Sequence, residues 1–98
     1  MRFTLQRPTE ALVTFLRRVG YAPHRSRQSF EISYVRRLGA VAEYPRFHLY
    51  CQETETEIIL NLHLDQKQPS YESSHAHSGE YEGAIIEKER DRIAQLTK

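Results

Sequence analysis

Hydrophobic residues recur at helical spacing in a segment near the start of the chain. From about residue 8 to residue 19, Leu12, Phe15, Leu16 and Val19 fall on one face of a helix. Gly20, directly after the last of these positions, suits the left-handed conformation that ends many helices. The pattern therefore predicts an amphipathic helix over about residues 8–19.

A second amphipathic pattern lies near the other end of the chain. Over about residues 84–96, four apolar side chains return at helical spacing: Ile85, Ile86, Ile93 and Leu96. On the polar side, Glu89 and Arg92 stand three positions apart, which is the spacing of neighbouring groups on a helix surface. We expect a helix with one apolar face and this ion pair on its surface.

Between the two helices, hydrophobic and polar residues alternate with the period of a β-strand. Three strands are predicted, over about residues 29–37, 46–52 and 57–65. In the second and third strands, alternation assigns these side chains to the core: Phe47, Leu49, Cys51, Ile58, Leu60, Leu62 and Leu64. It assigns these to the opposite face: His48, Tyr50, Ile59, Asn61, His63 and Asp65.

The order of these elements defines the predicted fold. Short links favour antiparallel neighbours. The pattern therefore predicts an α+β protein with the order helix, three-stranded antiparallel meander, helix (α-β-β-β-α), in which a single layer of sheet carries both helices on one face. The 98 residues fit one domain over residues 1–98. The polar segment over about residues 66–83 is expected to be a long loop.

This element order, with the helix followed by Val19–Gly20–Tyr21, resembles double-stranded-RNA-binding domains and the small HicA-type toxins that share their topology. The resemblance implies the α-β-β-β-α fold and concerns topology alone. HicA-type toxins carry Gly-Ser-His on the first strand, where this chain reads QSFEIS. RNA-binding domains carry a basic cluster where the second helix opens, and here that helix opens EKER.

The amino-acid composition indicates where in the cell the protein is expected. The single cysteine, Cys51, cannot form an intramolecular disulfide, and small secreted domains usually carry several paired cysteines. The first 20 residues lack the apolar run of a signal peptide, and no segment approaches the roughly 20 apolar residues that span a bilayer. We therefore expect a cytoplasmic protein that does not partner a membrane.

Positive charge is concentrated in the first half of the sequence. Residues 1–50 carry nine arginines against three acids, a net charge of +6, and residues 51–98 carry five basic residues against ten acids, a net charge of −5. Arginine forks bind phosphates and stack on bases. One hypothesis is therefore a nucleic-acid-binding module that uses Arg17, Arg18, Arg25, Arg27, Arg36, Arg37 and Arg46.

The favoured hypothesis is a divalent-metal site. His48, His63 and Asp65 are expected on the same sheet face, and His75 and His77 lie on the segment that follows the third strand. Imidazoles with a carboxylate suit Zn²⁺, or Mn²⁺ or Fe²⁺ if waters complete the coordination shell. We expect the imidazole of His63 to lie within roughly 6 Å of a loop histidine. No organic cofactor is evident.

A non-enzymatic role is favoured, and no catalytic residue is assigned. Asp65-Gln66-Lys67 resembles the Asp/Glu-x-Lys element of one nuclease superfamily, which implies a metal-dependent nuclease or hydrolase with Glu43 or Glu53 as a second acid. The remaining alternative is a protein-interaction module without metal. In that case the sheet face opposite the helices would mediate homodimerisation, with Val35 and Ile59 contributing apolar area.

Overall fold

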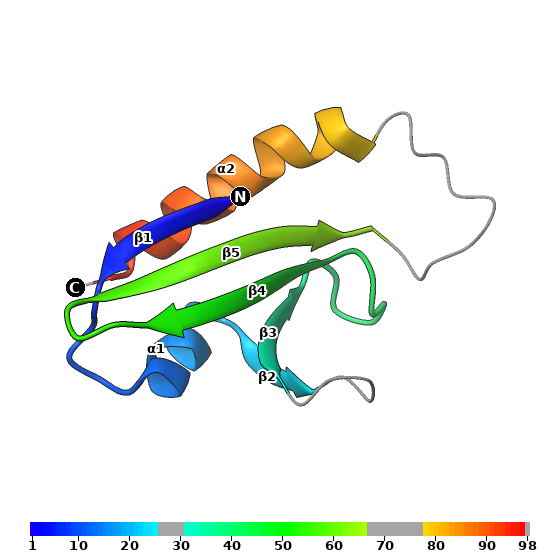
Figure 1. Cartoon of the computed structure of the whole chain (residues 1–98). Coiled ribbons are helices and arrows are strands. Elements are labelled where there is room, and N and C mark those ends of the chain that lie inside the picture. Colours follow the sequence, from blue (N-terminus) through cyan, green and yellow to red (C-terminus); the bar gives the residue numbers. More distant parts are fainter. Residues whose placement is uncertain (26–30, 67–77, 98) are drawn as a thin grey trace.

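A computed structural model describes residues 1–25, 31–66 and 78–97. The α+β class is confirmed, but the predicted three-stranded α-β-β-β-α topology is wrong, because the sheet has five antiparallel strands (Figure 1). The elements along the chain are β1 (Arg2–Gln6), α1 (Leu12–Val19), β2 (Ala22–Arg25), β3 (Ile32–Arg37), β4 (Arg46–Glu53), β5 (Glu57–Asp65) and α2 (Ser78–Gln95). The likeness in topology to RNA-binding domains and HicA-type toxins therefore does not extend to the observed strands.

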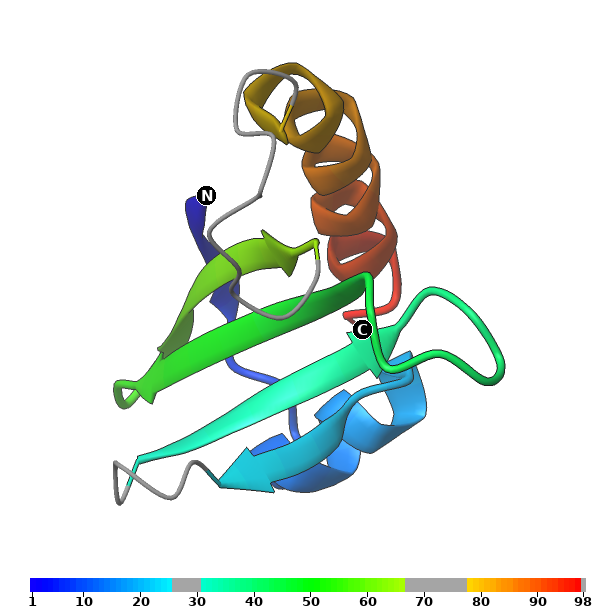
Figure 2. The same cartoon turned by 90° about the vertical axis from the view of Figure 1, so that its right-hand side faces the viewer.

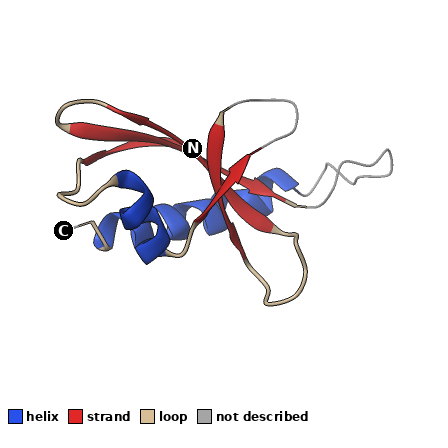
Figure 3. Cartoon of the chain, turned by 90° about the horizontal axis from the view of Figure 1, so that it is seen from below, coloured by secondary structure: helices blue, strands red, loops and turns tan. Residues whose placement is uncertain are grey.

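The five strands lie in the order β1-β5-β4-β3-β2. The two strands absent from the prediction are therefore the two edges of the sheet. β1 pairs with β5, with Phe3 opposite Leu60, and β2 pairs with β3, with Pro23 opposite Tyr34. The strands fan out, so the sheet is strongly twisted (Figure 3).

Both helices were predicted in the right regions, but their bounds differ from the structure. α1 begins at Leu12 rather than at about residue 8. It ends as expected, since Gly20 has a positive φ of 108° and donates its N–H to the carbonyl of Arg17 at 3.0 Å. α2 begins at Ser78, so residues 78–83 are helical instead of belonging to the predicted loop over 66–83.

The core lies between the two helices and one face of the sheet (Figure 2). The buried hydrophobic residues are Phe15, Leu16, Val19, Tyr21, Phe47, Leu49, Ile58, Leu60, Leu62, Leu64, Ile86 and Ile93. All except Tyr21 were predicted core positions. Cys51 packs against this cluster, and burial raises the pKa of its thiol to about 12, so it behaves as a small apolar side chain.

The face of the sheet that points away from the core is here called the distal face. Its side chains come from all five strands, and the candidate site lies where β3, β4 and β5 meet. In β5 the alternation is regular, with Leu62 and Leu64 buried and His63 exposed between them. Among the described helices, none is both long and apolar enough to cross a membrane.

Candidate functional site

Strand register brings three predicted metal-site residues together on the distal face. His48 of β4 lies directly opposite His63 of β5, and Arg46 lies directly opposite Asp65. His48 Nδ1 is 3.0 Å from Asp65 Oδ2, across one diagonal of this ladder. The period-2 alternation of both strands causes this arrangement, because it turns every second side chain to the same face.

Asp65 is held through one of its two carboxylate oxygens. Oδ2 accepts a hydrogen bond from Arg46 Nε at 3.2 Å in addition to the contact with His48. These contacts hold the pKa of Asp65 below its usual range, chiefly through the hydrogen bond with His48, with partial burial opposing the shift and Arg46 assisting it. No described residue bonds the other oxygen, Oδ1.

The pKa shift of Asp65 predicts how stability depends on pH. Because the folded pKa lies below the ordinary value of about 3.9, the carboxylate adds stability that is present above the unfolded pKa and lost as pH falls through the folded pKa. Asp65→Asn lacks this term. The difference in free energy of unfolding between wild type and variant should therefore shrink from about pH 5 to about pH 2. Urea unfolding with a chelator present measures it, and a constant or growing difference would contradict the assignment.

His48 uses both of its ring nitrogens in contacts with the protein. Nδ1 contacts Asp65, and Nε2 lies 2.7 Å from the hydroxyl oxygen of Ser33 on β3. The Ser33 hydroxyl can also donate to the carbonyl oxygen of His24 on β2, at 3.2 Å. The histidine side chain is 14% exposed and is fixed between two strands. Its role in this arrangement is to orient Asp65.

Ser33, His48 and Asp65 have the connectivity of a serine-hydrolase triad, with Nε2 toward the serine and Nδ1 toward the carboxylate. However, Ser33 is only 4% exposed. A substrate carbonyl needs direct access to the nucleophilic oxygen. The chain of hydrogen bonds is therefore best explained as a scaffold that links three strands.

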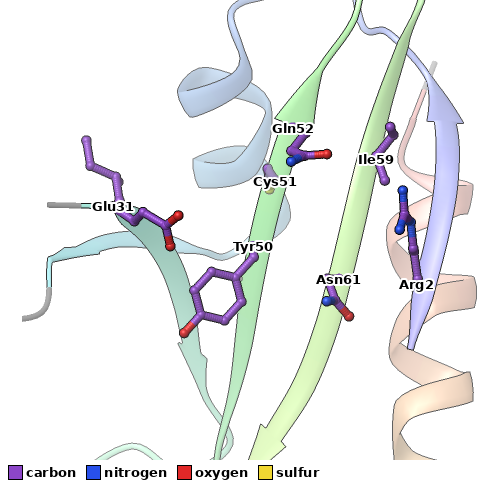
Figure 4. A pocket seen from close by; sticks show the side chains of 8 residues that line it. Arg2, Glu31, Tyr50, Cys51, Gln52, Ile59 and Asn61 are labelled. Carbon is purple, nitrogen blue, oxygen red and sulfur yellow. The ribbon is translucent and has the colours of Figure 1, made fainter. Parts of the chain in front are cut away.

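Aromatic rings connect this cluster to a neighbouring pocket. The Tyr50 ring stacks on His48 with 4.7 Å between the ring centroids, and it meets His63 edge-on at 5.9 Å. Tyr50 also lines a cavity of about 380 Å³ on the sheet (Figure 4). The other lining residues are Arg2, Glu31, Ile32, Cys51, Gln52, Ile59 and Asn61. The pocket thus contains both charge signs and apolar groups directly beside the histidines.

Two of the predicted metal ligands, His75 and His77, lie outside the described residues. The expected approach of a loop histidine to His63 therefore stays a prediction. In residues 1–25, 31–66 and 83–97, no three His, Cys, Asp or Glu side chains form a group that could hold a metal ion. The described part of the chain thus supplies at most part of such a site.

The acidic residues considered for a nuclease site, Glu43, Glu53 and Asp65, each form an ion pair with an arginine. Arg46 contacts Glu43 Oε1 through Nη1 at 3.3 Å and Asp65 through Nε, so its guanidinium lies between these two carboxylates. Glu53 pairs instead with Arg7 at 3.1 Å, at the far end of β4. Lys67 lies outside the described residues.

The arginines proposed for nucleic-acid binding separate into two groups. Arg18 pairs with Glu10 at 2.7 Å, Arg36 contacts Glu89 at 3.5 Å, and Arg46 contacts the carboxylates named above. Arg17, Arg25 and Arg37 are exposed, as is the paired Arg18, and Arg27 lies outside the described residues. Charge reversal at Arg36 would disturb a buried carboxylate, so Arg37 is the cleaner position for testing nucleic-acid binding.

The two apolar residues predicted to support a dimer through the distal face, Val35 and Ile59, are half-buried. Ile59 lines the pocket. These two residues therefore offer little exposed apolar area, and the exposed aromatic ring of this face is Tyr50, at 39% exposure. The sequence analysis did not predict that Ser33 contacts His48 or that Arg46 contacts Asp65. Strand alternation, which turns both residues to the face that carries His48, was the one feature of the sequence that could have indicated these contacts.

A comparison with protein-family models, with curated proteins and with solved structures finds no significant match for this chain. The functional argument therefore rests on the geometry of the described residues.

Proposed function

We propose that the protein binds a divalent metal ion of the zinc class at the end of β5. Asp65 and His63 are the two proposed ligands in the described chain, and His75 and His77 are proposed to complete the site from the segment after β5. The observation that carries the proposal is the state of Asp65, an oriented carboxylate with one oxygen engaged and the other without a bond from any described residue.

The environment of Asp65 matches what a ligating carboxylate requires. Carboxylates that bind metals are commonly oriented by hydrogen bonds from a second layer of residues, and here Arg46 and His48 act on Oδ2 alone. A lowered pKa keeps the group ionised, and metal binding needs the deprotonated ligand. The side chain is 30% exposed, which leaves a path for an ion from solution.

His63 lies two residues before Asp65 on the same exposed face. Alternate residues of a strand stand about 7 Å apart, so side chains at these two positions can reach one ion. Imidazole and carboxylate together favour Zn²⁺ and also accept Mn²⁺ or Fe²⁺. His48, which the sequence also offered as a ligand, has both ring nitrogens engaged by Asp65 and Ser33, so in this proposal it positions Asp65 and does not bind the ion.

The first test is elemental analysis of the untagged protein followed by calorimetric titration with ZnCl₂. Wild type should carry close to one equivalent of metal, and His63→Ala and Asp65→Asn should both lose it. His48→Gln should weaken zinc binding by about 10- to 100-fold, which is typical for a residue that orients a ligand. Circular dichroism of each variant checks that it remains folded.

His24→Ala is the matched control, because His24 is the one of the chain's five histidines that was at no stage a candidate ligand. Its ring lies edge-on to His48, 5.9 Å away, so the variant also tests for indirect effects on the cluster. Zinc affinity should stay unchanged in His24→Ala. Equal losses in His24→Ala and His63→Ala, or no zinc binding by wild type, would overturn the proposal.

A further inference from the structure

β1 lies at the edge of the sheet, and on its outer side no strand of the described residues pairs with it. The odd-numbered residues bond to β5: Met1 and Leu62 exchange two hydrogen bonds of 2.7 Å, and the N–H of Arg7 donates to the carbonyl of Thr56 at 2.9 Å. In an antiparallel strand the hydrogen-bonding direction alternates from one residue to the next. The N–H and C=O groups of Arg2, Thr4 and Gln6 therefore point away from β5.

The other edge of the sheet, β2, is better protected against strand pairing than β1. β2 has four residues and contains Pro23, which has no N–H to donate. β1 has five residues without proline, and of its three outward-pointing residues Arg2 is charged while Thr4 and Gln6 are exposed and uncharged. Natural sheets usually block exposed edges with proline, charge or a covering segment. β1 has one such device, the charge of Arg2 at its start, and its centre at Thr4 remains a surface for strand pairing.

We propose that β1 pairs with β1 of a second copy of this chain, antiparallel, about a two-fold axis at Thr4. Thr4 then lies opposite Thr4 of the other copy, and Arg2 lies opposite Gln6. These are the residues whose backbone groups point outward, so each pair can exchange both of its hydrogen bonds. Moving the register by two residues would leave an outward-pointing residue of each copy unpaired.

The side chains of β1 are complementary to themselves in this register. On the core side, Phe3 faces Leu5 of the second copy, and both side chains are half-buried at the margin of the core, where the pairing would cover them further. On the distal side, threonine faces threonine and arginine faces an amide, so no like charges lie opposite each other. A two-fold interface requires this self-complementarity, which favours a second copy over an unrelated peptide strand.

Sedimentation equilibrium tests the pairing directly, with EDTA present so that association through a shared metal is not counted. The average mass should rise with concentration from 11.6 kDa toward twice that value. Thr4→Pro removes an N–H that points outward and leaves the bonds to β5 intact. Its dissociation constant should rise by about 5- to 150-fold, as expected for two lost hydrogen bonds per dimer.

Thr4→Lys is a second variant that does not depend on how the strand tolerates proline. It places two lysines directly opposite each other in the proposed dimer and faces only Ile59 within the chain. It should weaken the dimer by about 2- to 5-fold and leave the unfolding midpoint of the monomer unchanged. A wild-type protein that stays monomeric up to about 1 mM would overturn the proposal.

Cysteine cross-linking tests the register. In a Cys51→Ala background, Thr4→Cys should form a disulfide-linked dimer on mild oxidation, since opposed α-carbons in such a pair are about 5.5 Å apart, within disulfide range. Arg2→Cys is the matched control. Its thiols would lie several residues apart across the two-fold axis, so it should cross-link far less. Equal cross-linking at both positions, or none at position 4, would contradict this register.

Discussion

Replacing Glu89 by alanine is expected to lower the free energy of unfolding by about 2–4 kcal/mol. Glu89 of α2 is 4% exposed, and its carboxylate accepts a 2.7 Å hydrogen bond from the Tyr21 hydroxyl and two 2.8 Å bonds from Arg92. Arg36 of β3 adds a longer contact at 3.5 Å. Removing one partner of a buried ion pair costs about 3–5 kcal/mol. We expect slightly less, because both arginines are about a third exposed and can be hydrated in part.

Urea unfolding of wild type and Glu89→Ala measures this loss, and Glu87→Ala is the matched control. Glu87 is exposed on the same helix, so its replacement should change stability by no more than about 0.5 kcal/mol. Tyr21→Phe removes only the hydroxyl and should cost about 1.5–3 kcal/mol, as for a hydrogen bond to a charged group. If Glu89→Ala and Glu87→Ala unfold at the same urea concentration, the carboxylate is not a structural link.

The Glu89 cluster shows what a local pattern can and cannot predict. The i,i+3 spacing correctly predicted that Glu89 and Arg92 would pair on α2. It could not predict that Glu89 would be buried, because Tyr21 and Arg36 reach its carboxylate from segments more than 50 residues away in the sequence. Arg92 also donates a hydrogen bond to the carbonyl of Val19 at 2.7 Å, and this bond connects α2 to the end of α1.

The strands also differ in whether the sequence alone could predict them. β5 was predictable because it buries every second side chain, and β4 because its apolar residues Phe47, Leu49 and Cys51 alternate with polar ones in the sequence. β1 and β2 have five and four residues, and each forms against a partner strand. For β1 this partner is β5, more than 50 residues away, and β2 contains a proline that usually indicates a loop. Their strand conformation is a consequence of tertiary pairing.

The sequence was sufficient to predict which face of the sheet carries the candidate site, but not which atoms of the site are in contact. Alternation was sufficient to assign His48, His63 and Asp65 to one side of the sheet. Which atoms meet depends on register, and the register places Arg46 opposite Asp65. An arginine that charge alone had assigned to nucleic acid therefore became a partner of the candidate carboxylate.

Leu62→Ala and His63→Ala change adjacent positions of β5. We expect the first to lower the stability of the fold and the second to affect metal binding alone. Leu62 is 0% exposed in the core, so its truncation should cost about 2–5 kcal/mol of unfolding free energy. His63 is exposed on the distal face, and its replacement in metal-free protein should change stability by no more than about 0.5 kcal/mol. Thermal unfolding in the presence of EDTA measures both effects.

Adding Zn²⁺ should distinguish the two variants by the change that it causes in their melting temperatures. An ion that binds only the folded state adds stability of RT ln(1 + [L]/Kd), or about 2.7 kcal/mol when zinc exceeds its dissociation constant by 100-fold. Leu62→Ala keeps the proposed ligands, so its melting temperature should rise with zinc by about as much as that of wild type. His63→Ala should show no such rise. If zinc shifts His63→Ala and Leu62→Ala equally, His63 is an ordinary surface residue, and the distal face acts without metal.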